Sequence, residues 1–249
     1  MTTREATSLL PRIGDTPVIG SAGRSFTDWA TMLAFGAFQW PWLVRSLHGG
    51  RLADKHALLD RLDLPYDALP YLGSWKADTG LLTLVTDHIF EHRPKLVVEF
   101  GTGASTLILA RALQKAGDGG QLISFDQHED FVDATRLWLA DYGLKADLRA
   151  VPLRPSADWP GLWYDHGPLP RDIDLMLIDG PPWSIHPFTR GGASVLFDNV
   201  AQGGTVMLDD GARPGERFVA RRWRSMRPDF DFKLLTGGTK GTLVGRRRG

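Results

Sequence analysis

Apolar and polar residues follow a distinct pattern in the second part of the chain, which begins near residue 95. Apolar runs of strand length, such as KLVVEF and DIDLMLID, are separated there by stretches with helical spacing, such as STLILARALQKA. Strands that are apolar throughout and that alternate with helices indicate a parallel sheet covered on both faces. The pattern therefore predicts a doubly wound α/β fold. The predicted strands are residues 95–100, 121–126, 146–153, 172–179, 204–210, 229–236 and 242–248, and the predicted helices are residues 105–116, 129–143, 193–201 and 216–226.

The end of the chain departs from this alternation. Two strand-like runs, residues 229–236 and 242–248, are separated only by the glycine-rich segment GGTKG. A connection of this length and composition predicts an antiparallel hairpin. Together with the five earlier runs, it predicts a Rossmann-like, mostly parallel seven-stranded sheet that ends in an antiparallel hairpin.

The first 75 residues carry a different pattern. Residues 1–25 are rich in Thr, Ser, Gly and Pro and predict an irregular leader. Residues 26–75 predict an accessory helical segment, with a break at Pro41 and a stop at Gly49 and Gly50. The α/β domain is expected over residues 76–249, where a further helix over residues 78–92 precedes the first strand.

The turn after the first strand has the composition of a ligand cradle. Gly101 and Gly103 permit positive φ or close contact between backbone and ligand, and the helix that begins near Ser105 offers unpaired N–H groups. A dinucleotide fingerprint would place a third glycine where this chain has Thr106. A polar ligand without a diphosphate is therefore the better fit, although a simple tight turn would use the same glycines.

The motif E-x-G-x-G, followed by Asp126 at the end of the next strand, resembles the class I S-adenosyl-L-methionine-dependent methyltransferases. The terminal hairpin is a second, independent resemblance to that family, and the two cover residues 95–247. The resemblance implies that the turn contacts the methionine part of the cofactor and that Asp126 binds the ribose hydroxyls. Glu99 would either bind the cofactor's amino group or accept N–H groups of the turn. The implied cofactor-binding residues are Glu99, Gly101, Thr102, Gly103, Ser105, Asp126, Gln127 and Asp179.

Two later segments, DGPPW and LDDGARPGE, resemble a branch of small-molecule methyltransferases related to the catechol O-methyltransferase type. In that type an Asp after the fourth strand and an Asp-Asn pair after the fifth hold magnesium. Asp179 and Asp210 match two of these ligands, but Gly211 stands at the Asn position. The resemblance leaves Mg²⁺ as an optional cofactor, with Asp209 or Glu216 as a replacement ligand.

Methyl transfer to a hydroxyl needs alignment of the reactants and removal of one proton. His186 has a suitable ordinary pKa, Asp210 is its competitor, and the predicted catalytic residues are His186, Asp210 and Asp179. His186 is equally compatible with a packed loop residue. Arg190 and Arg213 are expected to form ion pairs with the nearby acids rather than to clamp an anionic acceptor.

Composition limits the partners and the location. The chain has 29 basic residues (Lys and Arg) and 29 acidic residues (Asp and Glu), so no net positive charge favours binding to nucleic acid. The absence of Cys excludes disulfides and thiolate chemistry. No signal peptide is apparent, which favours the cytoplasm.

The apolar residues 29–44 contain three tryptophans but are too few to span a bilayer, which needs about 20. They predict packing on the domain, peripheral membrane contact or a homodimer interface.

These observations predict a methyltransferase, and thus a transferase, that methylates an oxygen of a small-molecule acceptor. Trp75, Lys76 and Asp78 are expected to help cover the cofactor or the acceptor, because they lie just before the helix over residues 78–92. Two alternatives remain open at this point. One is a nicotinamide-dependent oxidoreductase, and the other is a non-catalytic membrane-surface or partner-binding protein with a vestigial cradle.

Overall fold

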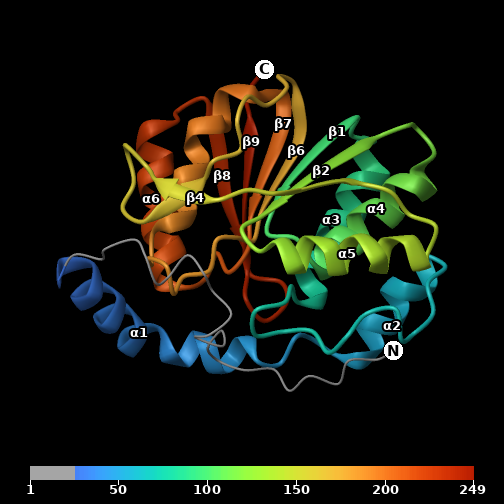
Figure 1. Cartoon of the computed structure of the whole chain (residues 1–249), viewed down its shortest axis with the longest axis horizontal. Helices are drawn as coiled ribbons and strands as arrows, with labels where there is room; N and C mark the ends of the chain where they lie inside the picture. Colours follow the sequence, from blue (N-terminus) through green and yellow to red (C-terminus); the bar gives the residue numbers. More distant parts are fainter. Residues whose placement is uncertain (1–25) are drawn as a thin grey trace.

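A computed structural model describes residues 26–249, which are built around one seven-stranded sheet with the strand order β3-β2-β1-β6-β7-β9-β8 (Figure 1). Strands β1, β2, β3, β6 and β7 are parallel, and β9 lies antiparallel between β7 and β8. The predicted fold class is confirmed, including the terminal hairpin. The strands are β1 (Leu96–Phe100), β2 (Gln121–Asp126), β3 (Asp147–Ala150), β6 (Ile173–Ile178), β7 (Val200–Leu208), β8 (Phe230–Leu235) and β9 (Thr242–Arg247).

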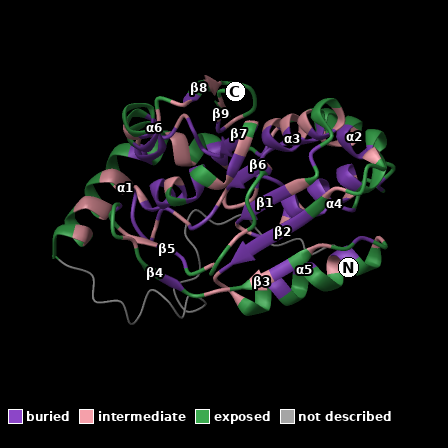
Figure 2. Cartoon of the chain, turned by 90° about the horizontal axis from the view of Figure 1, so that it is seen from above, coloured by how far each residue is buried: buried purple, intermediate pink, exposed green. Residues whose placement is uncertain are grey.

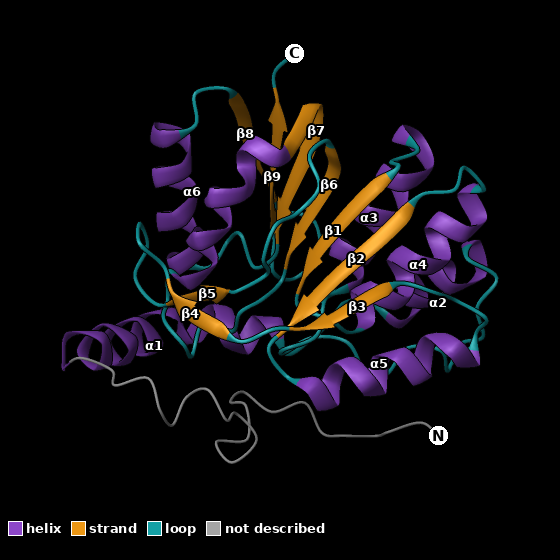
Figure 3. Ribbon diagram, turned by 45° about the horizontal axis from the view of Figure 1, so that its top comes forward, coloured by secondary structure: helices purple, strands orange, loops and turns teal. Residues whose placement is uncertain are grey.

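Helices cover both faces of the sheet, so that its strands are largely buried (Figure 2). One layer consists of α2 (Leu52–Arg61), α3 (Thr79–His92), α4 (Ala104–Ala116) and α5 (Glu129–Asp141). The other contains α6 (Pro214–Met226) and the 3₁₀ helix η1 (Thr189–Asn199), with α1 (Phe26–Ser46) packed against α6. The arrowheads of β1, β2 and β6 point toward the side on which α1 lies (Figure 3).

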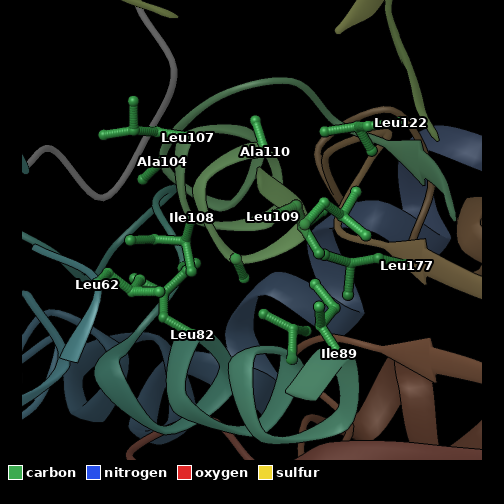
Figure 4. Packing of buried hydrophobic residues seen from close by; sticks show 14 of the residues in the cluster. Leu62, Leu82, Ile89, Ala104, Leu107, Ile108, Leu109, Ala110, Leu122 and Leu177 are labelled. Atoms are coloured by element: carbon green, nitrogen blue, oxygen red, sulfur yellow. The ribbon is translucent and has the colours of Figure 1, made fainter. Parts of the chain in front are cut away.

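Successive residues of each central strand pack into opposite cores. In β1, Val97 belongs to the core under α2–α5, whereas Val98 and Phe100 belong to the core under α6 and η1. The first core is formed largely by leucines, and Figure 4 shows side chains of α3 and α4, such as Leu82 and Ile108, together with Leu177 of β6. Because apolar side chains are buried on both faces, the strands show apolar runs rather than alternation.

Three predicted elements were wrong in detail. Helix α1 continues through Pro41, which costs one backbone hydrogen bond but does not end this helix. The predicted strand 146–153 ends at Ala150, and a separate antiparallel pair follows, β4 (Leu153–Pro155) and β5 (Leu162–Tyr164). The predicted helix 193–201 is the 3₁₀ helix η1, whose Gly191 and Gly192 pack directly on Trp159 and Trp163. Larger residues at these two glycines would meet the indole rings.

Helix α1 has one packed face and one exposed apolar face. Phe35 contacts Phe188 with ring centroids 4.9 Å apart, and Gly36 lies against Trp183. None of the described helices is long and apolar enough to cross a membrane. Packing on the domain is thus present, while peripheral membrane contact and a homodimer stay predictions. The exposed apolar residues of α1 are Phe26, Trp29, Leu33, Phe38, Trp40 and Val44.

Asp78 joins the start of α3 to the turn between β8 and β9. Its Oδ1 accepts a hydrogen bond from the backbone N–H of Leu81 (2.8 Å) and so caps the helix. Its Oδ2 accepts from the backbone N–H of Thr239 (2.5 Å), the hydroxyl of Thr239 (2.9 Å) and the backbone N–H of Lys240 (3.2 Å). Asp78 is therefore a structural clamp on the hairpin turn.

The clamp predicts that Asp78→Ala lowers the free energy of unfolding by about 2–4 kcal/mol, because the helix loses its cap and buried N–H donors lose their acceptor. Urea unfolding of the purified protein measures this loss. Asp87→Ala, on the exposed face of the same helix, is the matched control and should change stability by less than about 1 kcal/mol. Equal effects of the two variants would contradict the clamp.

Candidate functional site

The turn after β1 and the turn after β6 touch backbone to backbone. Gly101 has φ +104°, and a Cβ atom there would lie 2.8 Å from the backbone nitrogen of Gly180. The N–H groups of Asp179 and Gly180 both donate to the carbonyl of Phe100, at 2.8 and 2.7 Å. Gly101 is thus required by its positive φ and by this close approach.

Glu99 lies beneath the turn and is completely buried. Its Oε2 accepts hydrogen bonds from the hydroxyls of Thr106 and Ser124, both at 2.6 Å, and Thr106 Oγ1 accepts from the N–H of Gly103. Burial raises the pKa of Glu99 to about 7, against the opposing effect of nearby hydroxyls. Glu99 therefore buttresses the turn, which is one of its two predicted roles, and its Oε1 has no hydrogen-bond partner among the described residues.

Asp126 meets the same turn from the end of β2. Its Oδ2 accepts from the N–H of Thr102 (3.1 Å), and its Oδ1 accepts from the N–H of His128 (2.9 Å). Burial raises the pKa of Asp126, which these backbone donors partly offset. The residues of the predicted cradle, from two different strands, thus lie together. Ser105 is buried in the first turn of α4, next to Thr106.

Tyr164 of β5 was not identified from the sequence. Its hydroxyl lies 3.1 Å from Gln127 Oε1 and against Gly180, and its ring packs on Phe100. The only sequence feature that could have indicated it is the short aromatic run LWY, which lies after the end of the predicted strand 146–153. Arg154, on the neighbouring β4, pairs with Asp165 at 2.7 Å.

Tyr164 of β5 and Trp183 of the loop after β6 are both buried. Two shallow hollows on the described surface lie elsewhere. One is lined by residues of α3 and of the β8–β9 turn, and the other surrounds the end of α4.

Four carboxylates and three cations form a buried cluster after β6 and β7, which we call the charge cluster. Arg190 lies 3.0 Å from Asp210 and 3.3 Å from Asp179. Arg213 lies 3.0 Å from Asp210 and 2.5 Å from Glu216. The predicted ion pairing of both arginines is confirmed by these distances. The cluster consists of Asp179, Asp209, Asp210 and Glu216 with Arg190, Arg213 and Lys240.

The three aspartates of the charge cluster differ in acidity. Burial raises the pKa of Asp179 well above its ordinary value, and the neighbouring Asp209 adds to the effect. Burial also raises the pKa of Asp209. Burial acts in the same direction on Asp210, but Arg213, Lys240 and Arg190 outweigh it and hold its pKa well below the ordinary value. Asp210 is therefore a poor proton acceptor, whereas Asp179 and Asp209 are more basic.

His186 is buried near Gly161 and Phe188. Its Nδ1 accepts a hydrogen bond from the backbone N–H of Phe188 at 3.2 Å. A neutral imidazole with an accepting Nδ1 carries its proton on Nε2, which leaves neither nitrogen ready to take a proton from a substrate. This contact does not favour the predicted role as a base, which stays a prediction.

Two tryptophans, one of them on the loop after β6, face each other. The rings of Trp75 and Trp183 are nearly parallel, with centroids 6.5 Å apart. Both indole N–H groups and the side-chain amide of Gln39 are buried without a hydrogen-bond partner among the described residues. Gln39 lies on the packed face of α1, one turn beyond Gly36, and was not identified because a single glutamine in an apolar helix carries no functional pattern.

Comparisons with known proteins agree with this arrangement. Residues 98–211 match the model of a methyltransferase domain. The fold is shared with a methyltransferase from Geobacter sulfurreducens, at 20% identity over 79% of this chain and 87% of that chain, with a TM-score of 0.52. It is also shared with an O-methyltransferase from Bacillus cereus, solved with S-adenosylhomocysteine, at 15% identity over 87% of this chain and 100% of that chain, with a TM-score of 0.54.

A third solved structure is the O-methyltransferase of tomaymycin synthesis from Streptomyces achromogenes in complex with S-adenosylmethionine. It is 18% identical over 80% of this chain and 89% of that chain, with a TM-score of 0.51. A curated protein named uroporphyrinogen decarboxylase, from Mycolicibacterium smegmatis, is 26% identical over 63% of this chain. The chain spans about half the length of that relative, with 50% of it covered.

Residues 98–211 thus match a methyltransferase domain, and the seven-stranded sheet with its antiparallel β9 has the fold of solved O-methyltransferases.

The contact between the two turns predicts that Gly101→Ala destabilises the protein by about 1–3 kcal/mol and weakens S-adenosylhomocysteine binding at least tenfold, because both the positive φ and the neighbouring backbone oppose a Cβ. Calorimetry and urea unfolding measure the two effects. Gly119→Ala is the matched control, since Gly119 has φ +71° and a Cβ atom there would have no other atom within 4 Å. Gly119→Ala should lower stability through the strain of its positive φ but leave the affinity for S-adenosylhomocysteine unchanged. Unchanged cofactor affinity in Gly101→Ala would contradict the assignment.

Proposed function

We propose that the protein transfers the methyl group of S-adenosylmethionine to an oxygen of a small-molecule acceptor. The observation that carries this proposal is the hydrogen bond between the N–H of Thr102 and the carboxylate of Asp126, next to the buried Glu99. It brings the glycine turn and the acid of the next strand into one site, as a cofactor with a polar tail and a ribose requires.

The bound cofactor supplies an electrophilic methyl group on a sulfonium, and the chain's own residues bind and orient it. Gly101 and Gly103 leave the backbone accessible for the methionine part. Asp126 would accept hydrogen bonds from the ribose hydroxyls, with Gln127 next to it in the chain. Glu99 Oε1, which has no hydrogen-bond partner among the described residues, would bind the cofactor's amino group, directly or through water. The donor set of backbone N–H groups and carboxylates fits such a molecule.

The acceptor lies beside Trp75, Trp183 and Gln39. Their buried polar atoms have no partner among the described residues, and leaving such groups unpaired costs about 1–3 kcal/mol each. An acceptor with a flat face and hydrogen-bonding substituents would satisfy them. Trp183 follows Asp179 by four residues, so this region adjoins the charge cluster.

Asp179 is the proposed proton acceptor for the acceptor's hydroxyl group. Its side chain is on the loop that touches the glycine turn, and its raised pKa makes it a stronger base than Asp210. Asp210 instead holds three cations in place. His186 and Asp210 thus become positioning residues in this proposal.

The first experiment is calorimetric titration with S-adenosylhomocysteine and, separately, with NAD⁺, followed by a screen of phenols, sugars and carboxylates as acceptors. We expect S-adenosylhomocysteine to bind at micromolar or better affinity and NAD⁺ not to bind. Tight NAD⁺ binding without S-adenosylhomocysteine binding would favour an oxidoreductase instead.

The role of Glu99 predicts a proton linkage. The pKa of Glu99 is about 7 because of burial, so the carboxyl is mostly protonated at pH 6 and ionises when it pairs with the cofactor's ammonium group. Cofactor affinity should therefore fall up to tenfold per pH unit below about 7, with release of a proton on binding at pH 6. Calorimetry in buffers of different ionisation enthalpy measures both effects. Glu99→Gln should abolish the linkage, and an unchanged pH profile in that variant would contradict the contact.

The role of Asp179 predicts that Asp179→Asn lowers kcat by about 10²–10⁴-fold and changes S-adenosylhomocysteine affinity by only a few-fold. Steady-state kinetics with the acceptor found in the screen, together with calorimetry, separates the two effects. His186→Gln should retain most of the turnover. Full activity in Asp179→Asn, or a greater loss in His186→Gln, would overturn the assignment.

A further inference from the structure

Lys240 is the least expected member of the charge cluster. Its side chain is only 1% exposed, and its Nζ lies 3.2 Å from Asp209 Oδ2 and 3.6 Å from Asp210 Oδ1. Lys240 belongs to the turn between β8 and β9, far along the chain from both aspartates. Its ammonium therefore lies between two of the carboxylates for which the sequence predicted a metal ion.

The backbone around Lys240 is fixed on both sides. Its N–H donates to Asp78 at 3.2 Å, and its carbonyl accepts from the N–H of Ala212 at 3.2 Å. The next residue, Gly241, accepts from the N–H of Gly211 at 2.8 Å, which follows Asp210 directly. The turn that carries Lys240 is thus held against the loop that carries Asp209 and Asp210, and the lysine is built into the cluster.

Within residues 26–249, Asp179, Asp209 and Asp210 are the one group of at least three His, Asp or Glu side chains that could hold a metal ion. Most of their oxygens are engaged by cations, although Asp209 Oδ1 is buried without a hydrogen-bond partner among the described residues. Asp210 accepts from Arg190 and Arg213 through Oδ2 and faces Lys240 through Oδ1, and Asp179 faces Arg190. Magnesium takes about six oxygen ligands in near-octahedral geometry, several of them waters and one or two of them carboxylates. At Asp209 and Asp210 the ammonium of Lys240 already lies 3.2 and 3.6 Å from the carboxylate oxygens that would be such ligands.

The net charge of the cluster also argues against a bound divalent metal ion. With all groups ionised, four carboxylates and three cations leave one negative charge, too little to balance a divalent ion. Without Lys240 the same residues would carry two negative charges, which one divalent ion would neutralise. The ammonium of Lys240 thus supplies positive charge at Asp209 and Asp210, as a metal ion held by them would do.

We infer that this site works without a divalent metal, because the ammonium of Lys240 takes the metal's position between Asp209 and Asp210. The three aspartates are retained as ion-pair partners rather than as metal ligands. An ammonium is a compact charge with three hydrogen-bond donors, and it has no open coordination position for an acceptor oxygen. Lys240 is therefore a positioning residue, which orients carboxylates and contributes positive potential beside the proposed acceptor region.

The test is titration with Mn²⁺, followed by the electron paramagnetic resonance signal of the free ion. The intact chain should bind no stoichiometric Mn²⁺ up to about 1 mM. Lys240→Ala should bind one Mn²⁺ per chain at least tenfold more tightly, and Mg²⁺ should compete, because the variant removes the charge and opens space. Adding Asp209→Asn to Lys240→Ala should abolish that binding.

Lys233→Ala is the matched control, because Lys233 lies on the same hairpin outside the cluster. It should behave like the unchanged chain. One Mn²⁺ bound per unchanged chain and lost in Asp209→Asn would overturn the inference, whether or not Lys240→Ala folds. Failure of a folded Lys240→Ala to gain binding would also overturn it. Because no methyl transfer is measured, these outcomes are independent of the proposed function.

Discussion

The compensation of buried carboxylates by buried cations is the constraint on which this site depends. Parallel strands that end at one edge bring Asp179, Asp209 and Asp210 together, and ionised carboxylates without partners are costly to bury. The partners come from three other elements: Arg190 from η1, Arg213 from the start of α6, and Lys240 from the β8–β9 turn. The positions of these elements relative to the sheet are thus tied to charge balance.

A second constraint acts at the carboxyl ends of β1 and β6. Here close packing of two backbone turns, rather than charge, determines the structure. The turns after β1 and β6 approach so closely that a Cβ atom at Gly101 would lie 2.8 Å from the backbone nitrogen of Gly180, and a Cβ atom at Gly180 would collide with the hydroxyl of Tyr164. Hydrogen bonds from Asp179 and Gly180 to Phe100 hold this contact. It joins the proposed cofactor region to the loop that carries Asp179 of the charge cluster.

The fold was predictable because apolar strands and helical stretches alternate over residues 95–248, and because GGTKG marks the terminal hairpin. The meeting of the glycine turn with Asp126 was also predictable, since both follow neighbouring strands. Lys240, Tyr164 and Gln39 were not, because their importance depends on contacts between distant segments. The break expected at Pro41 failed because local propensity does not decide whether one proline ends a helix.

The clamp at Asp78 has a consequence for the order in which the molecule assembles. Asp78 and Thr239 are 161 positions apart, so their contact closes a very large loop. Such contacts form late, after local helices and neighbouring strands, because the entropy of closing the loop opposes them. During synthesis on the ribosome, the charge cluster therefore stays incomplete until the turn between β8 and β9 has emerged. A nascent chain that has not yet reached this turn would hold Asp209 and Asp210 without Lys240.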